Sequence, residues 1–104
     1  MDTASVQCMQ DCLACARVCE EAAGNALARG ARRGIADGLI ACAAVTGLLC
    51  ELLEEETEFD PALLELAASA CERVVASFRG EAWLEDAVTH ARACAHSSRA
   101  LAGG

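Results

Sequence analysis

The sequence contains no tyrosine and no lysine, and aromatic residues make up only 3% of its 104 positions. It has a single proline, Pro61, and all of its basic side chains are arginines. Alanine, leucine and valine dominate instead, and a composition so rich in alanine strongly favours α-helix. A chain of this length is expected to form one domain, residues 1–104, around one modest core.

Motifs and charges that the sequence lacks exclude several classes of function. The sequence has no G-x-S-x-G motif, no glycine-rich phosphate loop and no H-E-x-x-H motif, so we do not expect an enzyme. The net charge of −8 argues against nucleic acids and anionic membrane surfaces as partners, and it mildly favours cations. The first residues lack the pattern of a signal peptide, and the apolar stretch 38–53 is short for a membrane span and is interrupted by Glu51. We therefore expect a cytoplasmic protein with no membrane partner, and homo-oligomer formation stays open.

Eight cysteines stand out against this background, and in a reducing compartment they are expected to be thiols with a metal or redox role. Cys8, Cys12, Cys15 and Cys19 are spaced four, three and four residues apart. At about 100° per residue they fall at roughly 0°, 40°, −20° and 20° around a helix axis. On an amphipathic helix this narrow stripe is the centre of the buried face. A row of inward thiols packs a core poorly but suits a soft metal ion.

The apolar pattern predicts four amphipathic helices joined by short connections, over residues 3–28, 35–56, 61–78 and 81–102. Thr3 or Ser5 is expected to cap the first helix, and Asp60 before Pro61 is expected to cap the third. Gly80 separates the last two helices. Four such helices predict an all-α fold, an antiparallel up-down-up-down four-helix bundle.

Each predicted helix carries at least one inward thiol. With antiparallel helices that rise about 1.5 Å per residue, Cys12 and Cys15 lie near mid-height. The other helices place Cys50, Cys71, Cys94 and His90 at similar heights along the bundle axis. Cys19 and Cys42 pair nearer one end, and Cys8 lies nearer the other. The candidate metal ligands are therefore Cys8, Cys12, Cys15, Cys19, Cys42, Cys50, Cys71, Cys94 and His90.

Thiolate ligands select soft ions, namely Cu(I), zinc and the iron of iron–sulfur clusters. Two sulfurs four residues apart on a helix can converge on an ion that accepts low coordination, as Cu(I) does. Zinc usually requires a closed tetrahedral set, commonly on turns. A [4Fe–4S] cluster requires four cysteines around a cage, often with a C-x-x-C step, which Cys12 and Cys15 provide on a helix rather than a loop.

The segment from Cys8 to Glu21, CMQDCLACARVCEE, resembles the first helix of the cysteine-rich four-helix-bundle copper-binding family, whose studied members are copper storage proteins. Residues 42–50, the link 57–61, Cys71 and residues 90–94 continue the resemblance, which covers nearly the whole chain. It implies a bundle core lined with thiolates that bind many Cu(I) ions, with histidines at one mouth. Storage members carry more cysteines on the later helices, however. Here Ala91, Ser98 and Leu101 stand where further thiols are expected, which predicts a smaller site.

Three hypotheses follow. The first is a cytosolic protein that holds Cu(I) through cysteine thiolates in the bundle core, for sequestration or buffering. The second is the same bundle holding a [4Fe–4S] cluster for electron transfer or sensing. The third is a metal-free helical interaction module, in which the cysteines act as small buried hydrophobic residues.

Overall fold

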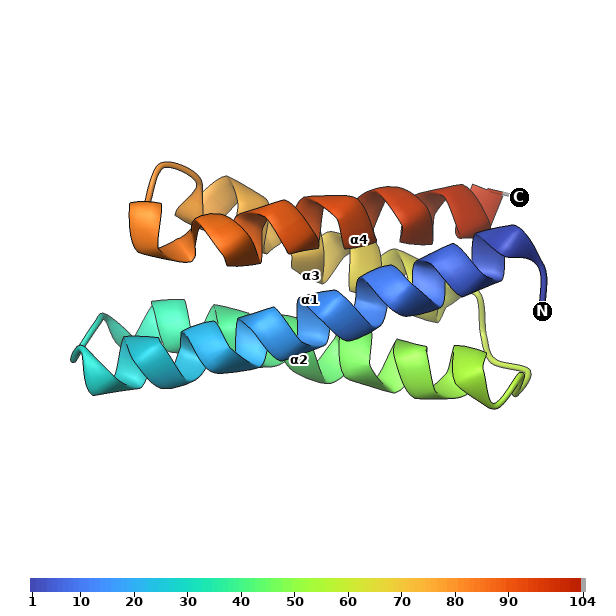
Figure 1. The fold of residues 1–104 in the computed structure, drawn as a ribbon, viewed down its shortest axis with the longest axis horizontal. Helices are drawn as coiled ribbons and strands as arrows, with labels where there is room; N and C mark the ends of the chain where they lie inside the picture. The colour runs from blue at the N-terminus through green and yellow to red at the C-terminus, as the bar shows by residue number, and fades with distance from the viewer. Residues whose placement is uncertain (104) are drawn as a thin grey trace.

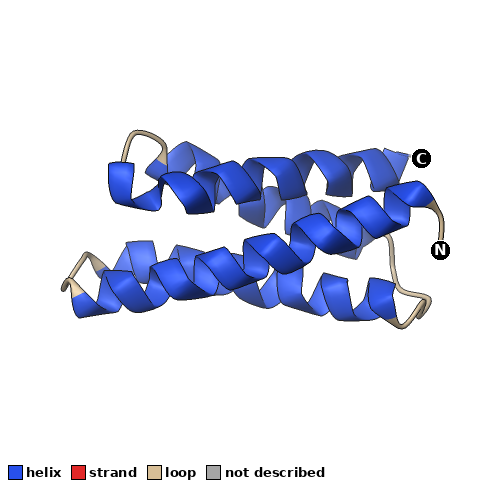
Figure 2. Cartoon of the chain, in the orientation of Figure 1, coloured by secondary structure: helices blue, strands red, loops and turns tan. Residues whose placement is uncertain are grey.

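A computed structural model describes residues 1–103 (Figures 1 and 2), and these residues are almost entirely helical, with no strand among them. The elements in chain order are α1 (Thr3–Ala28), α2 (Arg33–Glu54), α3 (Ala62–Phe78), a short 3₁₀ helix η1 (Ala82–Leu84) and α4 (Glu85–Gly103). The all-α prediction is confirmed. The bounds of the first predicted helix are correct. The second helix begins and ends two residues earlier than predicted, and the third begins one residue later.

The four long helices form a bundle in which α1 packs beside α2 and α4, and α3 packs beside the same two helices. Figure 1 shows the chain reversing direction at each connection, so that the two ends of the chain lie at the same end of the bundle. This is the predicted up-down-up-down arrangement. It brings the inward faces of all four helices onto one axis.

The helix ends follow local hydrogen bonding, and one predicted cap is wrong. The Asp2 carboxylate accepts the Ser5 backbone N–H at 2.7 Å, so Asp2 caps α1 in place of Thr3 or Ser5. An aspartate three residues before a free N–H satisfies that donor from outside the helix. The Asp60 carboxylate accepts the Ala62 backbone N–H at 2.9 Å, as expected for the start of α3.

The last helix starts differently from the prediction of one continuous helix. Gly80 adopts a φ of 93°, a left-handed conformation in which glycine meets little steric cost. One turn of 3₁₀ helix, η1, then follows before α4 begins at Glu85. The tighter turn rotates the start of this helix and places Leu84 in the core.

Helix α2 is the most apolar element. Contrary to the sequence-based expectation, its 22 residues are long enough and apolar enough to cross a membrane. The core helix of a bundle has the same properties. In this fold one face of α2, including Leu39, Cys42 and Leu49, is buried among the other helices.

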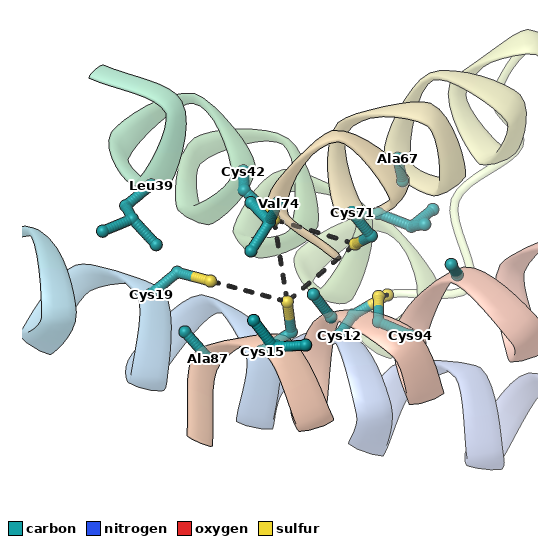
Figure 3. Close-up of a cluster of buried hydrophobic side chains, with 14 of the residues drawn as sticks. Cys12, Cys15, Cys19, Leu39, Cys42, Ala67, Cys71, Val74, Ala87 and Cys94 are labelled. Carbon is teal, nitrogen blue, oxygen red and sulfur yellow. Dashed lines mark hydrogen bonds between the residues drawn. The ribbon is translucent and has the colours of Figure 1, made fainter. Parts of the chain in front are cut away.

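The core has thiols at its centre and large apolar side chains on either side. All eight cysteines are buried. Because α2 runs antiparallel to α1, Leu39 lies beyond Cys19, as Figure 3 shows. Phe78, at the end of α3, and Leu84, in η1, belong to the same core. Toward the opposite end the core is filled by Leu49, Leu53 and Leu64. The thiols therefore occupy the central part of the core.

Candidate metal centre

The stripe predicted on α1 is buried as a whole. Cys8, Cys12, Cys15 and Cys19 each have 0% exposure. Figure 3 shows the side chains of Cys12, Cys15 and Cys19 pointing from α1 toward the other helices, and Cys8 belongs to the same core cluster. The spacing of four, three and four residues thus produces the row of inward thiols that the sequence indicates.

Cys15 is the centre of a group of four thiols. Its Sγ atom lies 3.9 Å from Cys19 Sγ, 3.7 Å from Cys42 Sγ and 3.9 Å from Cys71 Sγ (Figure 3). Cys42 and Cys71 also contact each other at 3.7 Å. Three helices therefore meet through their sulfur atoms at this level of the bundle.

A second group extends the row toward the end that holds the chain termini. Cys12 Sγ lies 3.5 Å from Cys94 Sγ on α4 and 3.9 Å from Cys8 Sγ on α1. The Ser98 hydroxyl closes this end of the row, 3.7 Å from Cys8 Sγ and 3.9 Å from Cys94 Sγ. The two groups join where Cys94 approaches Cys15, so seven of the eight cysteines form one continuous network.

Two sets of three thiols have the spacing of a metal site. Within Cys15, Cys71 and Cys94, and within Cys15, Cys19 and Cys42, all sulfurs lie within 4.8 Å of one another. A thiolate–metal bond of about 2.3 Å places sulfurs about 4 Å apart around a three-coordinate ion. The contacts of 3.7–3.9 Å around Cys15 are close to that value. An ion therefore fits either set with small side-chain movements, and Cys15 belongs to both.

A buried, all-sulfur network on a four-helix bundle agrees with the comparison to known families. The sequence matches the copper storage protein family over residues 1–103. The chain belongs to this family. No curated protein and no solved structure matches it. The predicted resemblance is confirmed, and membership of a storage family implies a non-catalytic protein.

Cys50 and His90 lie apart from the network of this copper storage family member. Cys50 is 5% exposed, but within residues 1–103 its sulfur has no contact with another thiol. Burial and the charges of Glu54 and Glu51 raise its pKa. His90 is only half-buried, because the neighbouring Ala91, about 100° around the helix, takes the inward position with 0% exposure. The expected meeting of Cys50 and His90 with the mid-height thiols is therefore not seen.

Two hydroxyl groups lie at inward positions next to the network. Ser98 stands where a further thiol is expected, and its Oγ contacts two cysteines. Its place four residues after Cys94 is the signal that locates it on the same face. Thr46 is fully buried four residues after Cys42, and its hydroxyl donates to the Cys42 carbonyl at 2.7 Å. Since this bond satisfies the hydroxyl within α2, Thr46 adds no free polar group to the core.

Contacts among the thiols raise the pKa of several of them. The hydrogen bond with Cys8 contributes most to raising the pKa of Cys12, and the hydrogen bond with Cys19 contributes most for Cys15. Burial adds to both increases, because it disfavours a charged thiolate. For Cys19 the contact with Cys15 acts in the opposite direction, but the contact with Cys42 and burial raise its pKa to about 12.

Cys42 and Cys94 behave differently, because each receives hydrogen bonds from several thiols. The Cys15 thiol is the leading cause that lowers the pKa of Cys42, and the Cys12 thiol is the leading cause for Cys94. A thiolate is the metal-binding form of cysteine. Cys42 belongs to one three-thiol set and Cys94 to the other, so in each set the neighbouring thiols lower the pKa of one member.

Proposed function

We propose that this protein is a cytosolic Cu(I)-binding protein that sequesters or buffers copper in the core of its bundle. The observation that carries this proposal is the continuous network of seven buried thiols, with two three-sulfur sets sharing Cys15. Membership of the copper storage protein family supports copper as the cargo. All eight cysteines are free thiols, which suits a reducing compartment such as the cytosol.

The chemistry of the donors favours Cu(I) over other soft ions. The network offers sulfur almost exclusively, and no carboxylate or imidazole belongs to either three-thiol set among residues 1–103. Zinc prefers four ligands in a closed tetrahedron, whereas the two sets in which every sulfur lies within 4.8 Å of the others have three members each. A [4Fe–4S] cluster would have to hold its four cysteine sulfurs apart around a cage of iron and sulfide. Here neighbouring sulfurs are already in contact at 3.5–3.9 Å, so the core is too tight for that cage.

The arrangement suggests how copper is held. Each Cu(I) ion displaces the protons of the thiols that bind it, and the charge of the resulting thiolates is balanced in part by the ion. All seven thiols of the network are fully buried, so the fold keeps water away from a metal ion that binds there. At about two soft ligands per low-coordinate ion, seven thiols hold roughly three or four copper ions. This is a smaller capacity than a core lined with thiols along its whole length would have.

The proposal is tested by anaerobic titration of the purified protein with Cu(I) in the presence of a competing chelator. We expect tight binding that levels off at roughly three or four ions per chain, with a protein that stays colourless in visible light. Iron and sulfide in near-equal amounts in anaerobically purified protein, together with a brown colour, would replace this proposal with the cluster alternative. No bound metal and no change in melting after copper addition would leave only a packing role for the cysteines.

A further inference from the structure

Three hydroxyl side chains are buried in the part of the core that the structure describes, and Ser98 differs from the other two. The Thr46 hydroxyl donates to the Cys42 carbonyl at 2.7 Å, and the Ser97 hydroxyl donates to two carbonyls of α4 at 3.2 and 3.3 Å. Such bonds are a common way in which a helix satisfies serine and threonine. Ser98 is fully buried, yet within residues 1–103 its hydroxyl bonds to no carbonyl. The oxygen of Ser98 contacts sulfur instead.

Ser98 closes a ring of contacts at one end of the thiol network. Its Oγ atom lies 3.7 Å from Cys8 Sγ on α1 and 3.9 Å from Cys94 Sγ on α4. Both of these sulfurs also contact Cys12 Sγ, at 3.9 Å and 3.5 Å respectively. The ring therefore joins two helices through three sulfurs and one oxygen, and all four side chains are fully buried. We call this group, formed by Cys8, Cys12, Cys94 and Ser98, the Ser98 ring.

A copper ion bound in the Ser98 ring leaves negative charge that the fold has to stabilise. A low-coordinate Cu(I) ion takes about two thiolates, so an ion and its ligands together carry about one excess negative charge. Burial makes such a charge unfavourable unless hydrogen bonds reach it. Among residues 1–103, no arginine or histidine side chain donates a hydrogen bond to a sulfur of the ring. The Ser98 hydroxyl contacts two of these sulfurs and can supply the bond.

The binding of copper determines the direction of this hydrogen bond. In the metal-free protein the serine and the two cysteines each carry a proton, so either partner can donate. Copper displaces the protons of the thiols that bind it. A copper-bound sulfur can only accept, and the serine proton is then the one left in the contact. Because a hydroxyl is a poor ligand for a soft ion, Ser98 is expected to donate to sulfur rather than to bind copper.

We propose that Ser98 is a positioning residue for a copper ion held by the three cysteines of the Ser98 ring, and that its hydroxyl donates a hydrogen bond to a copper-bound sulfur. This inference rests on the proposed function. In the binding step, copper–sulfur bonds form to cysteines of the ring, the thiol protons leave to the solvent, and Ser98 keeps its proton. Copper stays Cu(I) throughout. Outer hydrogen-bond partners of metal ligands typically change metal affinity by roughly 10–100-fold.

The first experiment measures the affinity for each copper ion by anaerobic titration against a competing Cu(I) chelator. Ser98→Ala is expected to bind as many ions as the wild type, but to hold one of them roughly tenfold to a hundredfold more weakly. Thr46→Val is the matched control, because it removes an equally buried hydroxyl that donates to a carbonyl rather than to sulfur. Thr46→Val should bind every ion with wild-type affinity. Circular dichroism and the melting temperature check that each variant is folded.

The second experiment separates a hydrogen bond from a packing effect. Ser98→Thr keeps a hydroxyl, so it should restore most of the copper affinity that Ser98→Ala loses. The ultraviolet charge-transfer absorption from sulfur to copper gives an independent readout, since a hydrogen bond lowers the energy of the sulfur electrons. At equal copper content this band should lie at longer wavelength in Ser98→Ala than in the wild type, and Thr46→Val should leave it unchanged. If Ser98→Thr does not fold, the comparison of Ser98→Ala with Thr46→Val decides alone.

The outcomes distinguish this inference from the proposed function. A wild-type protein that binds no Cu(I) contradicts the proposed function itself. If the wild type binds copper and Ser98→Ala holds every ion equally well, the proposed function stands and the role of Ser98 is wrong. Equal weakening in Thr46→Val also overturns it, because the loss of any buried hydroxyl then has the same effect. A folded Ser98→Thr that binds as weakly as Ser98→Ala, or an unshifted absorption band in Ser98→Ala, assigns the effect to packing and refutes the hydrogen bond.

Discussion

Cys15 belongs to both three-thiol sets, so its removal is the most direct test of the metal centre. In Cys15→Ala both sets lose a member, and the remaining sulfurs form pairs. The metal-binding free energy of a structural zinc site with four ligands is roughly 10–16 kcal/mol. If this free energy is divided equally among the ligands, one thiolate contributes about 3 kcal/mol. That corresponds to more than a hundredfold in affinity. We expect Cys15→Ala to lose about one or two bound copper ions and to bind the rest more weakly, as measured by anaerobic competition with a Cu(I) chelator.

Cys50→Ala is the matched control, because Cys50 is buried but contacts no other thiol in residues 1–103. Each variant removes one buried sulfur and should lower the free energy of unfolding of the apo protein by about 1 kcal/mol. This corresponds to a melting temperature about 4–8 °C lower. Copper content should fall only in Cys15→Ala. Wild-type capacity and affinity in Cys15→Ala, or an equal loss in Cys50→Ala, would refute the assignment of the shared site.

Three further predictions concern capacity, pH and stability. Ser98→Cys should raise the copper capacity by about one ion, because the Ser98 hydroxyl already lies 3.7 Å and 3.9 Å from two thiols; Ser77→Cys, on an exposed position, is the control that should add no buried ligand. The apparent Cu(I) affinity should fall at least tenfold for each pH unit as the pH is lowered from 8 to 6. The reason is that raised pKa values keep Cys12 and Cys15 protonated, and copper must displace those protons. An affinity independent of pH, measured by the same chelator competition, would contradict this prediction. Saturating Cu(I) should raise the melting temperature of the anaerobic protein by several degrees, because the ion binds the assembled bundle and not the unfolded chain. Scanning calorimetry with and without copper measures this shift. An unchanged melting temperature despite bound copper would show that the ion binds without bridging helices.

The fold was largely predictable because its signals are local. Helix periodicity, alanine content and the Asp60–Pro61 boundary depend on neighbouring residues alone, and the predicted bounds of α1 are those observed. The errors occur at helix ends. Asp2 rather than Thr3 or Ser5 caps α1, and a 3₁₀ turn precedes α4, because several residues at each end compete for the same free backbone groups.

The burial of the cysteine stripe on α1 was also determined by the sequence, since four residues at helical spacing necessarily share one face of a helix. Which thiols from other helices meet that stripe was decided by the tertiary structure. Axial register and helix rotation depend on the loops and on side-chain packing along the whole interface. In α4, a rotation by one residue places Ala91 inward and leaves His90 at the edge of the core. In α2, the axial register brings Cys42 into contact with Cys15, whereas Cys50 contacts no other thiol among residues 1–103. The composition of the metal centre therefore follows from packing between helices, which no pattern within a single helix specifies.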